Sequence, residues 1–291
     1  MPDQPQVDCI AHVGAILGEG PVWVEREQRL YWVDIKGRKV FRLRDDGGFD
    51  SFATPHRVGS LAPRANGGFV AGTDAGLALF DVEAGRFEVI ADPEAGIAGN
   101  RFNDGKVDRS GRFWAGTMDE GISKTSGALY RLDQDLSLSV VDRDYIVANG
   151  PAFSVDGRRM YHNDSAQQVT YVFELDAAGN AMNRREFARY CKDDGFPDGM
   201  TVDAEDCLWI AFWDGWCLRR YSPAGELLAT LQLPVQRPTS CAFGGDGLAT
   251  LYVTSAREGL EGTELARQPL AGGLFAVDPG VHGIAELPFA G

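Results

Sequence analysis

Short apolar runs recur along the chain between turns rich in Gly, Asp and Asn. Such runs, bounded by turn residues, are typical of β-strands, and no long stretch has helical periodicity. One pattern occurs six times: a turn, a strand of aromatic and β-branched residues, a second turn and a second strand. The first strands of the six copies are LYWVD at 30–34, FVAGT at 69–73, FWAGT at 113–117, MYHND at 160–164, LWIAF at 208–212 and LYVTS at 251–255.

The spacing of these copies predicts the fold. They are 39, 44, 47, 48 and 43 residues apart when aligned on Tyr31, Val70, Trp114, Tyr161, Trp209 and Tyr252. Repeats of about 40 to 50 residues are typical of propeller blades, each a sheet of four short strands. The sequence therefore predicts an all-β protein, a six-bladed β-propeller with four-stranded antiparallel blades, formed as a single domain by residues 1–291. Closing such a ring usually combines both termini in one blade, so we expect segment 7–13 to pair near the last blade.

One phase of the repeat is always polar. Because blades are related by rotation, residues at one phase lie at one height and radius, and the innermost phase converges on the axis. Ten to thirteen residues before the aligned positions stand Glu19, Ser60, Asn103, Asn149, Asp198 and Thr239. Four of them occupy similar small turns: E-G-P, N-D-G, N-G-P and D-G-M. The preference of Asn-Gly and Asp-Gly for turns explains a single such motif. Four polar turns at the same phase of the repeat, one of them with a Glu that has no special turn preference, indicate a functional ring.

The chemistry of this ring predicts a metal ion. Glu19 and Asp198, with the amides of Asn149 and Asn103, would bring two carboxylates and two amide oxygens together. Two carboxylates near one axis repel each other unless a cation separates them. A divalent cation such as calcium accepts carboxylate, amide and water oxygens. The identity of the metal stays open among calcium, manganese, zinc and iron(II), although a structural zinc site is not expected without thiolate or imidazole ligands.

Charge and composition exclude several classes of function. The chain has 28 Lys and Arg against 42 Asp and Glu, a net charge of −14, which disfavours nucleic acid and anionic membranes as partners. No segment approaches a membrane helix, and the N-terminal sequence does not resemble a signal peptide, so we expect a cytoplasmic protein. The five cysteines contain no C-x-x-C pair. A propeller of this size is self-sufficient as a monomer.

Four motifs in order carry a family resemblance. They are LGEGPVW from Leu17, NRFNDGKVDRSGRFWAGTM from Asn100, NGPAFSVDGRRMYHND from Asn149 and FPDGMTVDAEDCLWIAFWDG from Phe196. Together they resemble the senescence-marker-protein, regucalcin and gluconolactonase family. The resemblance implies a six-bladed propeller that hydrolyses sugar lactones with one divalent metal on its axis.

The resemblance also implies roles for individual residues. Glu19, Asn149 and Asp198 would be the metal ligands, in agreement with the ring. Arg101 and Asn103, in the R-x-N-D motif, would bind the substrate. Glu120, which follows the G-T-M segment, would be the substrate-binding acid.

Lactone hydrolysis requires a polarised carbonyl, an attacking water and a stabilised oxyanion, and a Lewis-acidic metal supplies the first and third. Our hypothesis is that Asp198 takes a proton from the water and passes it to the leaving ring oxygen. The substrate would be an aldonolactone such as gluconolactone, xylonolactone or arabinonolactone.

Two alternatives remain open. The same propeller and metal could hydrolyse an aryl ester or a phosphotriester, which an apolar wall of Phe102, Trp213 and Trp216 would favour. The chain could also be a metal-binding scaffold without catalytic activity, since a propeller fold alone does not fix a function. Among the histidines, His162 lies in a predicted strand from which it could reach the axis as an alternative base.

Overall fold

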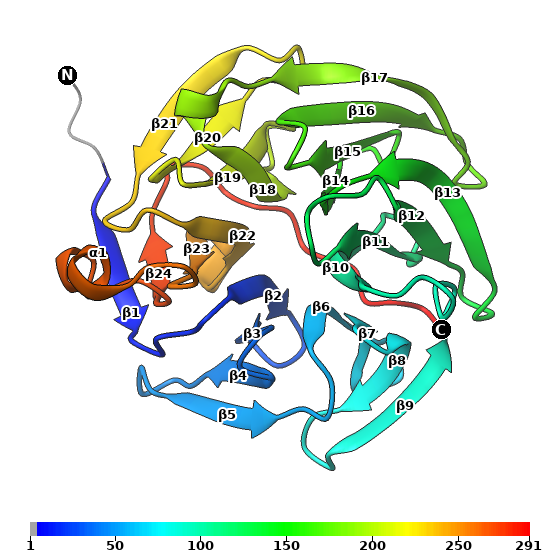
Figure 1. Ribbon diagram of the computed structural model, residues 1–291, viewed down its shortest axis with the longest axis horizontal. Coiled ribbons are helices and arrows are strands. Elements are labelled where there is room, and N and C mark those ends of the chain that lie inside the picture. Colours follow the sequence, from blue (N-terminus) through cyan, green and yellow to red (C-terminus); the bar gives the residue numbers. More distant parts are fainter. Residues whose placement is uncertain (1–4) are drawn as a thin grey trace.

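Six four-stranded antiparallel sheets surround a central axis in the computed structural model, which describes residues 5–291 (Figure 1). The predicted six-bladed propeller is therefore confirmed. All six first strands identified from the sequence are the second strands of their blades, counted from the axis.

From the axis outward, the first three blades contain β2 (Gly18–Val24), β3 (Arg29–Asp34), β4 (Lys39–Leu43) and β5 (Phe49–Ala53); β6 (Val58–Pro63), β7 (Phe69–Thr73), β8 (Gly76–Asp81) and β9 (Arg86–Ala91); and β10 (Asn100–Val107), β11 (Phe113–Asp119), β12 (Gly127–Leu132) and β13 (Leu138–Tyr145). The last three contain β14 (Ala148–Phe153), β15 (Arg159–Asp164), β16 (Val169–Leu175) and β17 (Ala181–Arg189); β18 (Phe196–Val202), β19 (Leu208–Trp213), β20 (Cys217–Tyr221) and β21 (Leu227–Gln232); and β22 (Pro238–Gly244), β23 (Thr250–Ser255), β24 (Leu274–Val277) and β1 (Val7–Ala11).

Helical structure is sparse. Two 3-10 turns occupy Lys192–Asp194 and Asp246–Leu248, and the helix α1 spans Gly262–Arg267. Within residues 5–291, no helix has the length and apolar character needed to cross a membrane.

The N-terminal strand closes the ring. β1 is the outermost strand of the sixth blade and pairs with β24, placing Val7 opposite Val277 and Cys9 opposite Phe275. The expected pairing of the N-terminal segment with the last blade is confirmed. The chain continues from β1 into β2 of the first blade. The backbone hydrogen bonds of β1 with β24 thus hold the first and last blades in one ring.

Burial changes from the axis outward. Every residue of β2, β6, β14 and β22 is buried, whereas β5 alternates between exposed and half-buried positions. The apolar core lies between neighbouring blades, as where Trp114 and Leu129 pack with Phe153 and Met160. The faces of the inner strands pack against apolar side chains of the neighbouring blades. Polar side chains on these strands therefore gather at the axis, where the ring residues are found.

After β24 the chain crosses the end of the propeller where the inner strands finish (Figure 1, red). Phe289 donates its backbone N–H to Pro63 O at 2.7 Å and accepts from Ala65 N at 2.8 Å, and its ring is fully buried. Glu286 pairs with Lys106 of β10 at 3.1 Å. This C-terminal segment, residues 280–291, covers the far end of the inner strands, opposite the end at which they begin.

Candidate functional site

All six ring residues are buried on the six inner strands, with exposed fractions of 7% or less. Each inner strand also has a register shift at or beside its ring residue: Glu19/Val22, Val58/Ser60, Phe102/Gly105, Asn149/Ala152, Pro197/Met200 and Pro238/Ser240. A β-bulge bends a strand and redirects a side chain, and bulges are common next to functional sites. The repeated bulge is therefore the local structure that places the polar ring.

Two aspartates fix the approach to Glu19 and Asn149. Asp34, at the end of β3, accepts hydrogen bonds from the backbone N–H groups of Ile16 and Leu17 at 3.0 and 3.1 Å, just before Glu19. Asp164, at the end of β15, does the same for the two residues at 146–147 that precede Asn149. The acid that ends the LYWVD and MYHND repeats therefore holds the loop that carries a predicted metal ligand.

The glycines after these residues are required by geometry. Gly20 and Gly150 have φ values of +50° and +81°, which side chains other than that of glycine rarely tolerate. Gly199, after Asp198, faces Ser240 so closely that a Cβ atom would collide with the serine side chain. The E-G, N-G and D-G pairs thus combine a functional side chain with a backbone that only glycine allows.

Glu19 and Asp198 form a buried acidic pair. Burial, together with repulsion from Asp198 and then Asp104, raises the pKa of Glu19 well above its usual range. Burial and the charge of Asp104 likewise raise the pKa of Asp198. Within residues 5–291, neither carboxylate forms an ion pair with a Lys, Arg or His. The charge of Arg101 opposes both shifts but does not outweigh burial. Two buried charges without an ion-pair partner are costly, and a bound cation would lower that cost.

Asn149 supplies an amide oxygen beside this pair. Its Oδ1 accepts from Asn103 Nδ2 at 2.6 Å, and its Nδ2 donates to Ser165 Oγ at 2.7 Å, so both ends of the amide are held. Ser165 Oγ in turn donates to Pro197 O at 2.5 Å, next to Asp198. An amide oxygen keeps a second lone pair for another partner.

The donor set fits a hard divalent ion. In the described part of the chain, no three His, Cys, Asp or Glu side chains gather as a metal cluster. A site on the axis would therefore use Glu19 and Asp198 with the Asn149 oxygen as its third protein ligand. Carboxylate and amide oxygens suit calcium, magnesium or manganese, which commonly complete their shells with water.

The three residues predicted to bind substrate form one hydrogen-bonded group. Arg101, which is 5% exposed, donates its Nη1 to Asn103 Oδ1 at 2.7 Å and its Nε to the Glu120 carboxylate. Burial raises the pKa of Glu120, but the charges of Arg101 and Arg57 outweigh burial and lower it overall. Glu120 is therefore held as a carboxylate between two guanidinium groups.

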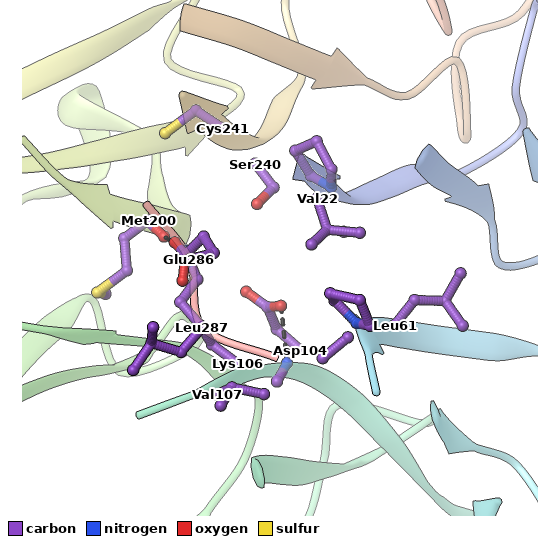
Figure 2. Close-up of a pocket in the computed structure, with 15 residues that line it drawn as sticks. Val22, Leu61, Asp104, Lys106, Val107, Met200, Ser240, Cys241, Glu286 and Leu287 are labelled. Carbon is purple, nitrogen blue, oxygen red and sulfur yellow. Dashed lines mark hydrogen bonds and ion pairs between the residues drawn. The ribbon is translucent and has the colours of Figure 1, made fainter. Parts of the chain in front are cut away.

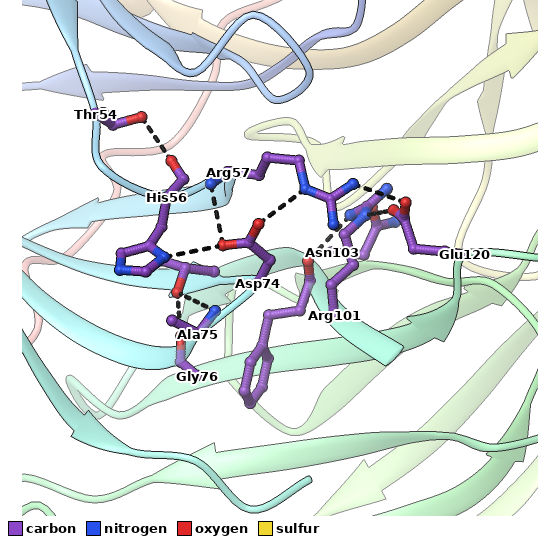
Figure 3. Close-up of polar contacts among 11 residues, drawn as sticks. Thr54, His56, Arg57, Asp74, Ala75, Gly76, Arg101, Asn103 and Glu120 are labelled. Atoms are coloured by element: carbon purple, nitrogen blue, oxygen red, sulfur yellow. Dashed lines mark hydrogen bonds and ion pairs between the residues drawn. The ribbon is translucent and has the colours of Figure 1, made fainter. Parts of the chain in front are cut away.

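Sequence reasoning missed Arg57, which precedes β6, and its partner Asp74. Arg57 donates Nε to Asp74 Oδ2 at 2.9 Å and Nη1 to Glu120 Oε2 at 2.7 Å (Figure 3). Arg57 and Glu120 come from neighbouring blades, and no sequence motif marks this contact. Asp74 follows the FVAGT repeat directly, but the other five copies have an uncharged residue at that position, so the repeat gave no signal for it.

Asp104 was also missed, although it stands in the N-D-G motif. Its carboxylate points into a cavity on the axis that Val22, Met200 and Ser240 help to line (Figure 2). Burial raises the pKa of Asp104 to about 6, against the opposing effects of Lys106 and of backbone N–H groups at Gly105 and Gly150. This third buried acid lies between the candidate metal site and the C-terminal segment.

Two of the residues considered for alternative chemistry, His162 and Phe102, are buried in the core. His162 is fully buried against Tyr145, neither ring nitrogen has a hydrogen-bond partner within residues 5–291, and burial lowers its pKa to about 3. Phe102 is 2% exposed and packs against Tyr130, and Trp213 packs against Arg237. His162 as a base reaching the axis, and Phe102 as a wall of the site, are therefore wrong.

Comparison with known proteins identifies the family of the chain. Residues 17–257 match the model of the SMP-30/gluconolactonase/LRE-like family. The chain is 42% identical over 287 residues to a 6-deoxy-6-sulfogluconolactonase of Pseudomonas putida, covering 97% of this chain and 98% of the relative. It is 38% identical to regucalcin of Gallus gallus, covering 98% and 99% of the two chains.

A solved structure of a calcium-binding protein, regucalcin of Agrobacterium tumefaciens, superposes with a TM-score of 0.93 at 28% identity. The superposition covers 98% of this chain and 97% of that one. The match spans all six blades, since both chains are covered almost completely. The chain belongs to the SMP-30/gluconolactonase/LRE-like family, as its four motifs predicted.

Proposed function

We propose that this protein hydrolyses a sugar lactone to the aldonic acid with the help of one divalent metal ion. Its family and its sulfogluconolactonase relative make it a lactonase by class. The observation that carries the proposal is the buried Glu19 and Asp198 pair, which forms no ion pair within residues 5–291 and is accompanied by the hydrogen-bonded series Asn149, Asn103 and Arg101.

Glu19, Asn149 and Asp198 would hold the metal. A divalent ion there would polarise the lactone carbonyl and stabilise the negative charge that develops on its oxygen. The arrangement gives hard oxygen ligands from three different blades, β2, β14 and β18.

Asp198 would act as the base. It takes a proton from a water molecule while the water oxygen forms a bond to the carbonyl carbon. The bond between that carbon and the ring oxygen then breaks, and Asp198 returns the proton to the ring oxygen, which becomes a hydroxyl group. The products are accounted for by one lactone and one water, and no further reactant is needed.

Arg101 and Asn103 would orient the sugar. Arg101 Nη2 has no hydrogen-bond partner within residues 5–291, so its two N–H groups keep their capacity to donate to a ligand. Guanidinium donors suit hydroxyl and ring oxygens. The Glu120 carboxylate fixes this guanidinium and retains lone pairs for a substrate hydroxyl.

The polar mouth favours a sugar over an aryl ester. The Phe102 ring lies in the core, and the groups around Asn103 are guanidinium, amide and carboxylate. A polyhydroxylated ligand can satisfy such donors and acceptors, whereas an aromatic leaving group would leave them without partners.

The test is a substrate panel. Proton release in weak buffer is followed after five- and six-membered aldonolactones, an aryl ester or a phosphotriester are added to metal-supplied protein, with spontaneous hydrolysis subtracted. We expect turnover of at least one aldonolactone well above that of the other esters. Turnover of the aryl ester or phosphotriester without any lactone hydrolysis would overturn the proposal.

A further inference from the structure

We propose that Arg57 is a further substrate-binding residue, which donates to an oxygen substituent on the exocyclic carbon of the sugar lactone. The inference rests on the proposed function, because it extends the same site outward. It adds a subsite on the second blade to the residues Arg101, Asn103 and Glu120 of the third.

A continuous chain of hydrogen bonds runs from the candidate metal site to the partly exposed side chains of Glu120 and Arg57. Asn149 Oδ1 accepts from Asn103, Asn103 Oδ1 accepts from Arg101, Arg101 donates to Glu120, and Arg57 donates to Glu120 from the other side. Asp74 completes the chain by accepting from Arg57 (Figure 3). Each residue along this chain is positioned by the previous one.

Glu120 and Arg57 are more exposed than Arg101. The Arg101 side chain is 4% exposed, whereas the side chains of Glu120 and Arg57 are 29% and 28% exposed. A lactone whose carbonyl carbon lies beside Asp198 would have its ring hydroxyls near Arg101 and Asn103. Its exocyclic carbon is attached to C5, on the other side of the ring oxygen from the carbonyl carbon, and its substituent projects outward from the ring. The proposal directs that substituent toward Arg57, the more exposed of the two arginines.

Arg57 keeps hydrogen-bonding capacity for a ligand. Its Nε and Nη1 atoms are used by Asp74 and Glu120, but Nη2 has no partner within residues 5–291. The two carboxylates hold the guanidinium plane in place, so little side-chain entropy would be lost when Nη2 donates to a substrate oxygen. A guanidinium that is already oriented is what a specificity subsite requires.

The charges of the subsite accept two kinds of oxygen. Arg57 and Arg101 are balanced by Asp74 and Glu120, so the four side chains carry no net charge. A neutral hydroxymethyl group can accept a hydrogen bond from Nη2, and so can the oxygens of a 6-sulfonate. The shared chemistry is an acceptor oxygen on the exocyclic carbon.

The test compares substrates that differ only at this carbon. Glucono-1,5-lactone and xylono-1,5-lactone have the same ring, but the second lacks the exocyclic carbon, and a 6-deoxy-6-sulfogluconolactone carries a sulfonate there. Arg57→Met removes the donors with little loss of length, and Arg57→Lys keeps the charge without the planar donors. Arg185→Met, on an exposed position of the outermost strand β17, is the matched control.

We expect Arg57→Met to lower kcat/KM for gluconolactone about tenfold, chiefly through KM, and to change that for xylonolactone less than about twofold. The factor of ten corresponds to one lost hydrogen bond to a charged donor. Arg57→Lys should fall between the wild type and Arg57→Met. A larger loss with the sulfonated lactone than with gluconolactone would identify the anion as the substituent that Arg57 binds, and the reverse order would identify the hydroxyl.

Equal losses on gluconolactone and xylonolactone would overturn the proposal, because Arg57 would then act only by holding Glu120. Thermal unfolding of both variants is measured in parallel. If Arg57→Met lowers the Tm, the comparison of the two lactones is made with Arg57→Lys, for which equal losses likewise overturn the proposal. If the wild type turns over no lactone at all, the proposed function fails instead, and the two failures are distinguishable.

Discussion

Asn103 of β10 donates its Nδ2 to Oδ1 of Asn149 in β14, at 2.6 Å, across the boundary between the third and fourth blades. Asn103 Nδ2 also donates to Ala148 O at 2.9 Å, and Asn103 Oδ1 accepts from Arg101. One amide thus joins the residue predicted as a metal ligand to the residues predicted to bind the sugar. A change at Asn103 should affect both functions.

We therefore predict that Asn103→Ala weakens metal binding and raises KM together. Asn149 loses the donor that orients its oxygen, and a lost hydrogen bond of this kind is worth up to about tenfold in affinity. Calorimetric titration of chelator-stripped protein with a divalent metal measures the first effect, and steady-state kinetics the second. Gln134→Ala, which removes an exposed hydrogen bond to Ser110, is the control. Unchanged metal affinity would separate Asn103 from the metal site.

Metal binding should stabilise the fold. A ligand that binds only the folded state adds about 2.7 kcal/mol at a hundredfold excess over its Kd. We expect the Tm of chelator-stripped protein to rise when the metal is added, because the ion relieves the repulsion between Glu19 and Asp198. Glu19→Gln should lose most of this rise, and Glu88→Gln, at an exposed position of β9, should keep it. An equal rise in both variants would place the metal elsewhere.

The sequence predicted the ring better than its surroundings, and the reason is structural. Ring positions recur at one phase of the repeat, so six copies report the same location, and the aromatic second strands are recognisable in each copy. Asp104 was overlooked because consecutive side chains of a regular strand point to opposite faces. With Asn103 facing the axis, the next residue is expected to face away from it. The register shift between Phe102 and Gly105 breaks that alternation and lets consecutive side chains face the axis.

The contact of Arg57 with Glu120 depends on how far a side chain reaches across two blades, which no repeat encodes. The C-terminal segment lies outside the repeat altogether, and its place over the inner strands is set by contacts with Pro63, Gly111 and Lys106 that are distant in sequence. Local pattern therefore predicts the blades, whereas the contacts between blades require the structure.

That segment should be a stability element separate from catalysis. Phe289 is fully buried with Val107 and Phe113, at the opposite end of the inner strands from Arg57. Phe289→Ala should lower the free energy of unfolding by about 3–5 kcal/mol, as expected for a buried ring. At low temperature, lactone turnover should change less than about twofold. Leu227→Ala, at a side chain that is 52% exposed, is the control for denaturant unfolding. A loss of turnover in a folded Phe289→Ala protein would contradict this separation.

His162 should make the fold sensitive to acid. The pKa of His162 is lowered from 6.5 to about 3, first by burial and then by Arg184. Below pH 6.5 the unfolded chain binds a proton that the folded chain excludes, so the stability present above pH 6.5 is lost as the pH falls toward 3. The slope approaches about 1.4 kcal/mol per pH unit.

His162→Phe keeps the ring packed against Tyr145 and removes this proton. Its free energy of unfolding, relative to that of the wild type, should therefore increase steadily between pH 6.5 and pH 4 in urea titrations. His12→Phe, at an exposed position, should leave the pH dependence unchanged. A constant difference between His162→Phe and the wild type over this range would show that His162 takes no part.

The most direct test of the central proposal is Asp198→Asn, assayed on an aldonolactone at saturating metal with the bound metal measured in the same samples. Asparagine keeps an oxygen for the metal but cannot take a proton from water. We predict that the variant binds the metal and folds like the wild type while turnover falls by about 10²–10⁴-fold, the range that a general base contributes. Near-normal turnover in metal-bound Asp198→Asn would contradict the assignment of Asp198 as the base.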